Sequence, residues 1–412
     1  MMQQTDVTKT MKWVFMSFLV AFVLSGCVEK KAVKVREPED ALVLCKGWRS
    51  LKFSDDMDKD SLKTAIERSI EYLKRLPADR KFVYGPHKYT AGYVIESMNT
   101  FMDILAGSAG SKDLDKKVRR LFHVYKSIGS DGKGSMLFTG YYEPVLKGSL
   151  ARSEEYDYPL YTKPSDLTVI GLERFSARFK GERIIARYDD NRVVPYYNRK
   201  EIDVDKVLEG KGLELLWVSD PVDIFFLQVQ GSGVIELEDG NVQRVHYAAS
   251  NGRPYRSIGR VLIDEKILSR DEISLQAVKT YLKGHPKERN RIMNYNESYI
   301  FFEKVDNGPF GNIDVVLTAG RSIATDYRLF PKGALAFIVT EKPEIDQSDR
   351  ITEWTSFSRF VTNQDTGGAI RGAGRVDLFW GTGKYAGIEA GAMQQHGEMY
   401  FLVKKPDENK MM

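Results

Sequence analysis

The most informative segment of this 412-residue chain covers residues 363–383 and reads Asn363-Gln364-Asp365-Thr366-Gly367-Gly368-Ala369-Ile370-Arg371-Gly372-Ala373-Gly374-Arg375-Val376-Asp377-Leu378-Phe379-Trp380-Gly381-Thr382-Gly383. Seven glycines lie between positions 367 and 387. This density predicts tight turns and close approaches of the backbone. Asp365 and Asp377 bracket the glycine-rich part, so they are the first candidates for chemistry.

The surroundings of Asp377 favour a role as a general acid. Its neighbours Val376, Leu378 and Phe379 are apolar. An apolar setting raises the pKa of a carboxyl group because the charged form loses its solvation. Such a carboxyl holds a proton near neutral pH, as a general acid must. A structural role remains open for Asp377 at this point.

Turn formation is the competing interpretation for Asp365 and for Asp326, which ends the segment Gly320-Arg321-Ser322-Ile323-Ala324-Thr325-Asp326. Aspartates in turns accept backbone N–H bonds, so both roles stay open. The triplet Asp365-Thr366-Gly367 also resembles an aspartic-protease loop. Such a site needs two of these loops or a dimer. The chain has one such triplet, and polar Asn363-Gln364 precede it, so this interpretation is rejected.

Composition excludes several classes of protein. The 61 Lys and Arg against 57 Asp and Glu give a net charge of +4 without a block of like charge, so no nucleic-acid partner is expected. Two cysteines exclude a disulfide scaffold and a Cys-rich zinc module. The five histidines lack metal-ligand spacing, and nucleotide-binding, zinc-protease and serine-hydrolase motifs are absent. No metal and no cofactor is therefore predicted.

The N-terminus has the pattern of an export signal. An apolar run of 12 residues, Trp13 to Leu24, follows Lys9 and Lys12. The run is shorter than the roughly 20 apolar residues that cross a bilayer. A basic flank before a short apolar run is typical of a secretory signal.

The residues that follow, Leu24-Ser25-Gly26-Cys27, resemble a bacterial lipobox, in which the cysteine is lipidated and becomes the new first residue. The resemblance implies a signal peptide at 1–26 and a lipid on Cys27. This lipid would anchor the protein to a membrane, with the protein facing the periplasm. An ordinary signal with a chance cysteine is the alternative. Val28 after the cysteine, in place of Asp, favours the outer membrane. Residues 27–40 then form a charged tether, and Cys45 is expected to be a buried thiol.

Periodicity predicts helices early in the chain and strands later. Three helices are predicted from apolar spacing at 60–73, 90–105 and 118–125. Residues 234–247 are predicted to form a hairpin. Three buried strands are predicted at 313–317, 335–340 and 399–403. Many short strands without intervening helices favour β-barrels over a doubly wound sheet.

Three further segments make the pattern recognisable. They are Phe138-Thr139-Gly140-Tyr141-Tyr142-Glu143-Pro144, Phe226-Leu227-Gln228-Val229-Gln230-Gly231-Ser232-Gly233 and Tyr247-Ala248-Ala249-Ser250-Asn251-Gly252-Arg253-Pro254-Tyr255. The three aspartates resemble those of the 3D domain. Together the motifs are similar to hallmark segments of the membrane-bound lytic murein transglycosylase A family, over residues 135–405, and the lipobox agrees with this resemblance.

The resemblance implies a mainly β fold with N-terminal helices. A double-psi β-barrel and a second, smaller β-barrel would flank a groove that holds the glycan. The catalytic barrel domain would comprise residues 41–144 and 306–412, with the 3D motif at 313–385. Residues 145–305 would form the inserted glycan-binding domain.

The resemblance also implies the reaction. This family is a lyase-type, non-hydrolytic group of enzymes that cleave the β-1,4 bond between N-acetylmuramic acid and N-acetylglucosamine in peptidoglycan. The product is a 1,6-anhydromuramoyl end, because the sugar's own 6-hydroxyl attacks and no water is consumed. One carboxyl then suffices as acid and base, unlike the two of typical glycosidases. Motif position assigns this role to Asp377, with Asp365 and Asp326 supporting it through hydrogen bonds.

The motifs further nominate residues that bind substrate, namely Thr139, Tyr141, Gln230, Gly231 and Ser232. Core packing fits Tyr142 and Trp380 equally well, and Glu143 is given no nucleophilic role. The implied partners are peptidoglycan strands, the outer membrane through the lipid on Cys27, and wall-synthesis or remodelling proteins. The competing functions are a hydrolase and a non-catalytic glycan-binding lipoprotein, and the three intact aspartates argue against the second.

Replacing Cys27, whose thiol would carry the lipid, tests the predicted membrane anchor. In Cys27→Ala the protein is expected to move from the membrane fraction to the soluble fraction, with its activity on isolated peptidoglycan unchanged, because Cys27 lies outside the catalytic segments. Cell fractionation and immunoblotting measure this, with Cys45→Ala as a control that keeps the anchor. Persistent membrane binding of Cys27→Ala would show that lipid on this residue is not the main anchor.

Overall fold

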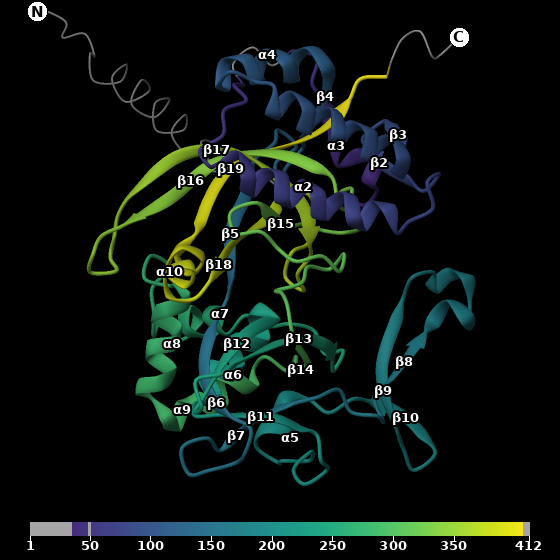
Figure 1. The fold of residues 1–412 in the computed structure, drawn as a ribbon. Coiled ribbons are helices and arrows are strands. Elements are labelled where there is room, and N and C mark those ends of the chain that lie inside the picture. Colours follow the sequence, from purple (N-terminus) through teal and green to yellow (C-terminus); the bar gives the residue numbers. More distant parts are fainter. Residues whose placement is uncertain (1–34, 48–50, 407–412) are drawn as a thin grey trace, which may run out of the picture.

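The computed structural model describes residues 35–47 and 51–406, so the predicted signal peptide and Cys27 lie outside the described residues. Two bodies built on β-sheets lie one above the other, with helices against both (Figure 1). This confirms the predicted mainly β fold with N-terminal helices. Among the described residues, no helix is long and apolar enough to cross a membrane.

The first body is a closed barrel. Its strands are β5 (Met136–Glu143), β15 (Ser322–Ala324), β16 (Leu335–Ile345), β17 (Ile351–Asp365), β18 (Arg375–Thr382) and β19 (Gln394–Lys404). They pair in the order β19-β16-β17-β15-β18-β5, and β5 pairs back to β19, which closes the ring. The β15–β17 and β18–β5 pairs are parallel, and the others are antiparallel. Closure leaves these six strands without a free edge.

Helices and two further strands cover this barrel. Strand β4 (Phe122–Ser127) pairs with β19 and carries β1 (Leu42–Leu44) on its other side. The helices are α2 (Lys59–Lys74), α3 (Ala91–Ala106) and α4 (Ser111–Leu121), with the hairpin β2 (Lys81–Tyr84) and β3 (His87–Thr90) between the first two. They share one large apolar core with the barrel interior. Cys45, predicted to be buried, is half-buried against this core.

Two segments differ from the sequence prediction. The third predicted helix, 118–125, ends at Leu121, because alternating Phe122 and Val124 enter β4 as buried strand residues. The predicted strand 313–317 is an irregular turn, with Asp314 in the left-handed region at φ 55°. Predicted strands 335–340 and 399–403 are confirmed within β16 and β19.

The second body is a six-stranded sheet that curls toward closure. Its strands are β6 (Val145–Ser149), β7 (Tyr158–Tyr161), β11 (Glu214–Val218), β12 (Ser232–Leu237), β13 (Val242–Ser250) and β14 (Ile300–Val305). Their order is β14-β13-β12-β6-β11-β7, and a bridge between Thr162 and Phe302 links the two ends. The predicted hairpin is confirmed as β12 and β13. Leu146, Leu216 and Ile235 belong to its apolar core.

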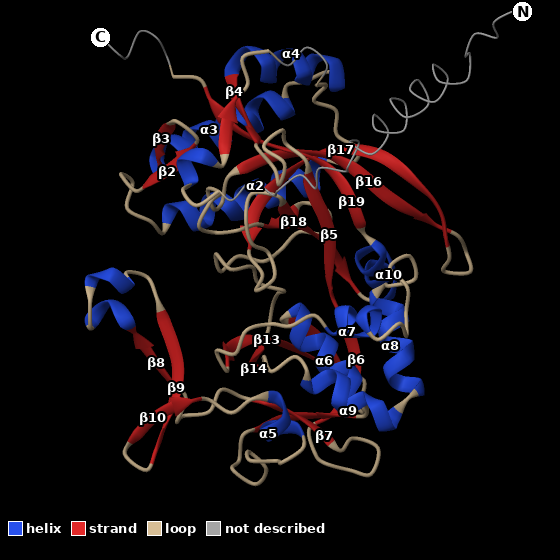
Figure 2. Cartoon of the chain, turned by 180° about the vertical axis from the view of Figure 1, so that it is seen from behind, coloured by secondary structure: helices blue, strands red, loops and turns tan. Residues whose placement is uncertain are grey.

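Helices and a small sheet flank this second body. The helices are α5 (Arg199–Asp203), α6 (Pro221–Gln230), α7 (Ile258–Asp264), α8 (Leu275–Gly284) and α9 (Pro286–Asn294). Strands β8 (Thr168–Gly171), β9 (Arg183–Asp189) and β10 (Arg192–Pro195) form a separate sheet that projects from the body (Figure 2). Helix α10 (Lys384–Ala392) packs against β5 and β18 of the first barrel.

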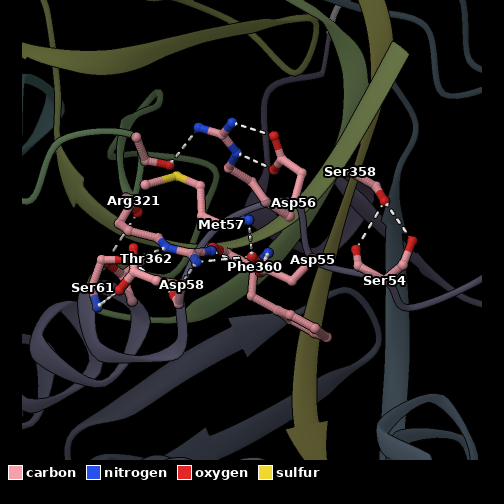
Figure 3. Close-up of polar contacts among 12 residues, drawn as sticks. Ser54, Asp55, Asp56, Met57, Asp58, Ser61, Arg321, Ser358, Phe360 and Thr362 are labelled. Atoms are coloured by element: carbon pink, nitrogen blue, oxygen red, sulfur yellow. Dashed lines mark hydrogen bonds and ion pairs between the residues drawn. The ribbon is translucent and has the colours of Figure 1, made fainter. Parts of the chain in front are cut away.

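A buried arginine fastens the N-terminal segment to the barrel (Figure 3). The Arg321 side chain is fully buried, and its Nη1 and Nη2 donate to the Asp55 carboxylate at 2.7 and 2.8 Å. The same guanidinium donates to the carbonyl oxygens of Phe360 and Asp58. Such a fully satisfied buried cation holds its neighbours in one arrangement, since removing one partner would leave a charge unpaired. Because Arg321 immediately precedes β15, this network fixes the strand that neighbours β18.

Candidate active site

Strand β18 places Asp377 on the outer face of the first barrel. In the paired strands, Ala324 of β15 and Thr139 of β5 are the Cα partners of Asp377. Val376 and Leu378 are 0 % exposed and belong to the barrel core. Because side chains alternate along a strand, Asp377 points away from that core.

The Asp377 carboxyl is desolvated although it lies outside the core. Its Oδ1 is buried and has no hydrogen-bond partner among the described residues. The pKa of Asp377 is raised to about 6, chiefly by burial; the positive charge of Arg375 opposes this rise, and the negative charge of Asp365 adds a smaller increase. At a pKa of about 6 the carboxyl is protonated in about half of the molecules at pH 6 and in about a tenth at pH 7, far more than for an exposed aspartate, so it can serve as a proton donor.

Asp365 ends β17 and faces the same region. Its Oδ1 accepts the backbone N–H of Asn312 at 2.9 Å and that of Thr366 at 2.8 Å. Burial raises the pKa of Asp365, and these bonds oppose the rise. The Tyr141 hydroxyl is buried in this region, and the nearby charges of Asp365 and Asp377 add to the effect of burial in raising the pKa of Tyr141. The structure thus brings Asp377, Asp365 and Tyr141 together.

Asp326 has a different position. It is 0 % exposed, and its carboxylate accepts from Arg328 Nε at 2.9 Å, Arg328 Nη2 at 2.7 Å and the N–H of Gly372 at 2.8 Å. Burial alone would raise the pKa of Asp326, but these hydrogen bonds outweigh it and lower the pKa. Asp326 therefore ties the glycine-rich loop to the turn after β15, which is the structural role that its sequence context left open.

The second body adjoins this face through β12, β13 and α6. A buried Glu143 carboxylate, at the end of β5, accepts from Arg244 Nη1 of β13 at 2.7 and 2.6 Å. Thr382, at the end of β18, donates to the same carboxylate at 2.7 Å. Glu143 thus joins the two bodies, and both of its carboxylate oxygens already accept hydrogen bonds.

The motif residues of the second body lie beside this junction. Gln230 ends α6, and its Oε1 accepts the backbone N–H of Tyr142 at 3.1 Å. Gly231 follows with its backbone in the left-handed region at φ 86°, and β12 begins at the next residue, Ser232. Ser232 is the Cα partner of His246 on β13.

Two of the aromatic side chains are part of the packing. Tyr142 is 8 % exposed and packs with Ala386 and Ala390 of α10. Trp380 packs against the same cluster. Core packing accounts for Tyr142, whereas Trp380 is half-buried and its Nε1 has no hydrogen-bond partner among the described residues, so both of its predicted roles stay open.

Sequence reasoning missed Arg375 and His246. Three residues at this site have a buried side-chain polar atom without a hydrogen-bond partner in the described part of the chain, namely His246, Arg375 and Asp377, and the buried Tyr141 hydroxyl lies beside Asp365. Buried polar groups are normally hydrogen-bonded, so this concentration indicates groups that a ligand would satisfy. The spacing Arg375-Val376-Asp377 was the available signal for Arg375, since alternate residues of a strand share a face.

Comparisons with known proteins show the family of this chain. Residues 137–303 match the MltA specific insert domain, and residues 321–403 match the 3D domain. A curated relative, membrane-bound lytic murein transglycosylase A of Vibrio cholerae, is 30 % identical over 277 residues, which are 66 % of this chain and 67 % of the relative. The chain belongs to the membrane-bound lytic murein transglycosylase A family.

Solved structures of this family share the fold. The structure of membrane-bound lytic murein transglycosylase from Agrobacterium tumefaciens is 27 % identical, with a TM-score of 0.68 over 85 % of this chain and 98 % of that chain. The structure of MltA from Escherichia coli with bound chitohexaose has a TM-score of 0.69 at 24 % identity, over 90 % and 98 % of the two chains. These likenesses confirm the predicted family and its barrel fold.

Burial of the Asp377 carboxyl predicts that the free energy of unfolding of the wild type falls with rising pH relative to that of Asp377→Asn. Its folded pKa of about 6 lies above the unfolded value of about 3.9. The native state binds the extra proton between these values, so stability is lost as pH rises through this window and stays reduced above it. Asp377→Asn has no charge to desolvate and is expected to be more stable than wild type at pH 8, by up to about 3 kcal/mol, with no such gain at pH 4.

Urea unfolding at both pH values measures this difference. Asp190→Asn, on an exposed turn at φ 44° that Asn tolerates, is the matched control and should show no pH-dependent gain. An equal effect of Asp377→Asn at pH 4 and pH 8 would contradict a desolvated carboxylate at this position.

Proposed function

We propose that this chain is a lytic transglycosylase that cleaves the β-1,4 bond between N-acetylmuramic acid and N-acetylglucosamine in peptidoglycan, with Asp377 as its single acid and base. The observation that supports this most is the half-buried Asp377 carboxyl on the barrel face, whose Oδ1 is buried without a hydrogen-bond partner among the described residues and whose pKa is raised to about 6. A protonated carboxyl can donate to a leaving oxygen, and the carboxylate that results can accept a proton.

The reaction needs only one such group. Asp377 donates its proton to the glycosidic oxygen, the bond from that oxygen to the muramyl C1 breaks, and N-acetylglucosamine leaves with the electron pair. The 6-hydroxyl oxygen of the muramyl unit then bonds to C1, and its proton passes to Asp377. Atoms and charge balance without water, whereas two-carboxylate glycosidases use a second group as nucleophile or base. Asp365 would hold the site in place, since its Oδ1 already accepts the backbone N–H groups of Asn312 and Thr366.

The proposed substrate site lies between the two bodies. Thr139 and Tyr141 would contact the glycan from β5, with the tyrosine ring offering a stacking face, and Gln230, Gly231 and Ser232 would do so from the second body. This assignment is supported by Thr139 being the strand partner of Asp377 and by Gln230 contacting the backbone of β5. Asp365 and Asp326 would support the site, the first beside Asp377 and the second through the glycine-rich loop.

The domain division and the location are part of the proposal. Residues 41–144 and 306–412 would form the catalytic domain around the closed barrel, and residues 145–305 the inserted domain, which agrees with the strands of the two sheets. The curated relative is named as membrane-bound. We infer that a lipid on Cys27 anchors this chain to the outer membrane, facing the periplasm, where wall-synthesis or remodelling proteins could be its neighbours.

Digestion of purified sacculi tests the reaction. Wild type is expected to release fragments with 1,6-anhydromuramoyl ends, identified by mass spectrometry. Asp377→Asn is expected to lose this product by roughly 100-fold or more, the scale of a general acid's contribution. Asp190→Asn should match wild type.

Two outcomes would contradict the proposal. Ordinary reducing ends in the wild-type digest would indicate a hydrolase. Full activity of Asp377→Asn would remove this residue from the acid role.

A further inference from the structure

Arg375 lies beside Asp377 on the same outward face. The two residues are separated by Val376 on β18, so their Cα atoms lie roughly 7 Å apart. Arg375 Nη2 donates to Thr139 Oγ1 at 3.2 Å. Because Thr139 is the strand partner of Asp377, this bond directs the guanidinium toward the candidate site.

The Arg375 guanidinium has unused hydrogen-bonding capacity. Other arginines close to this face are paired: Arg328 with Asp326 at 2.7 Å, and Arg244 with Glu143 at 2.6 Å. Within residues 35–47 and 51–406, no carboxylate lies within ion-pair distance of Arg375, and its buried Nε has no hydrogen-bond partner. A guanidinium presents five N–H donors in a planar fork, which suits a carbonyl or carboxylate oxygen.

A role in raising the pKa of Asp377 does not explain why an arginine occupies position 375. Its positive charge lowers the pKa of Asp377, against the rise caused by burial. A general acid at this position would hold its proton better without that charge. Because the half-buried Arg375 lowers the pKa of the neighbouring acid, its position is better explained by contact with the substrate.

The chemistry of the substrate supplies a matching group. This step rests on the proposed function, which places C1 of a muramyl unit at Asp377. Muramic acid differs from glucosamine by a lactyl ether on O3 of the same ring. That ether ends in a carboxyl group, which is either free or joined to the stem peptide as an amide. Both forms offer a carbonyl oxygen, and the free form also carries a negative charge.

We propose that Arg375 binds the lactyl carbonyl or carboxylate of the muramyl unit and thereby selects muramyl glycans over glycans built of N-acetylglucosamine alone. Thr139 orients the guanidinium by accepting from Nη2, and Nε–H and the remaining N–H groups donate hydrogen bonds to the lactyl oxygen. Arg375 is thus a specificity residue of the same site that contains Asp377.

Binding without turnover tests this role. The full chain carrying Asp377→Asn is titrated by calorimetry with three ligands: chitohexaose, peptide-free glycan chains with free lactyl carboxylates, and peptide-bearing glycan chains. Adding Arg375→Gln is expected to weaken both muramyl ligands by roughly tenfold or more, as for the loss of a charged hydrogen bond. Chitohexaose affinity should change by less than about twofold and also reports that the variant is folded.

Two further variants sharpen the result. Arg375→Lys keeps the charge without the fork and should recover part of the affinity for the free carboxylate but little for the amide. Arg350→Gln removes the same charge from an exposed turn between β16 and β17 and should leave all three affinities unchanged.

Two outcomes would overturn the role of Arg375: an equal loss for chitohexaose and the muramyl ligands, or no loss for any of them. The proposed function fails separately, through the absence of anhydro ends in the wild-type digest. Anhydro ends together with an unchanged muramyl affinity in Arg375→Gln would remove only the inference about Arg375.

Discussion

Closure of the first barrel is the constraint on which the site depends. Because β5 pairs back to β19, β18 is held between β15 and β5, with hydrogen-bonded neighbours on both sides. Val376 and Leu378 are committed to the core, so alternation leaves Asp377 on the outer face. There the surrounding protein buries the Oδ1 of its carboxyl, and the described residues supply no hydrogen-bond partner to that oxygen. The raised pKa of Asp377 follows from this placement, with like charge from Asp365 as a smaller contribution.

The rest of the structure fixes the neighbours of this strand. Arg321, buried against Asp55, holds the start of β15 (Figure 3). Asp326 ties the glycine-rich loop through Gly372. Glu143, shared by Arg244 and Thr382, sets the second body against the end of β18. Each of these carboxylates is fully engaged in hydrogen bonds, which distinguishes it from the unpartnered carboxyl oxygen of Asp377.

Local sequence was sufficient for some of these features and not for others. The apolar neighbours of Asp377 predicted its raised pKa, and the hairpin at 234–247 followed from its turn and its alternation. The prediction of a helix at 118–125 was wrong in its second half, because these residues pair with β19 as strand β4 despite their helical apolar spacing. The bond from Arg375 to Thr139 spans 236 positions, and that from Arg321 to Asp55 spans 266. Such contacts depend on which strands become neighbours, and no local pattern encodes that.

The central claim is that one carboxyl cleaves the glycan while the sugar's own hydroxyl takes the place of water. The most direct measurement is digestion of sacculi in water enriched in ¹⁸O, followed by mass spectrometry of the newly formed muramyl ends. The account predicts anhydro ends that carry no ¹⁸O, because both atoms of the new C1–O6 bond come from the substrate. Muramyl ends that carry one ¹⁸O at C1 would contradict it.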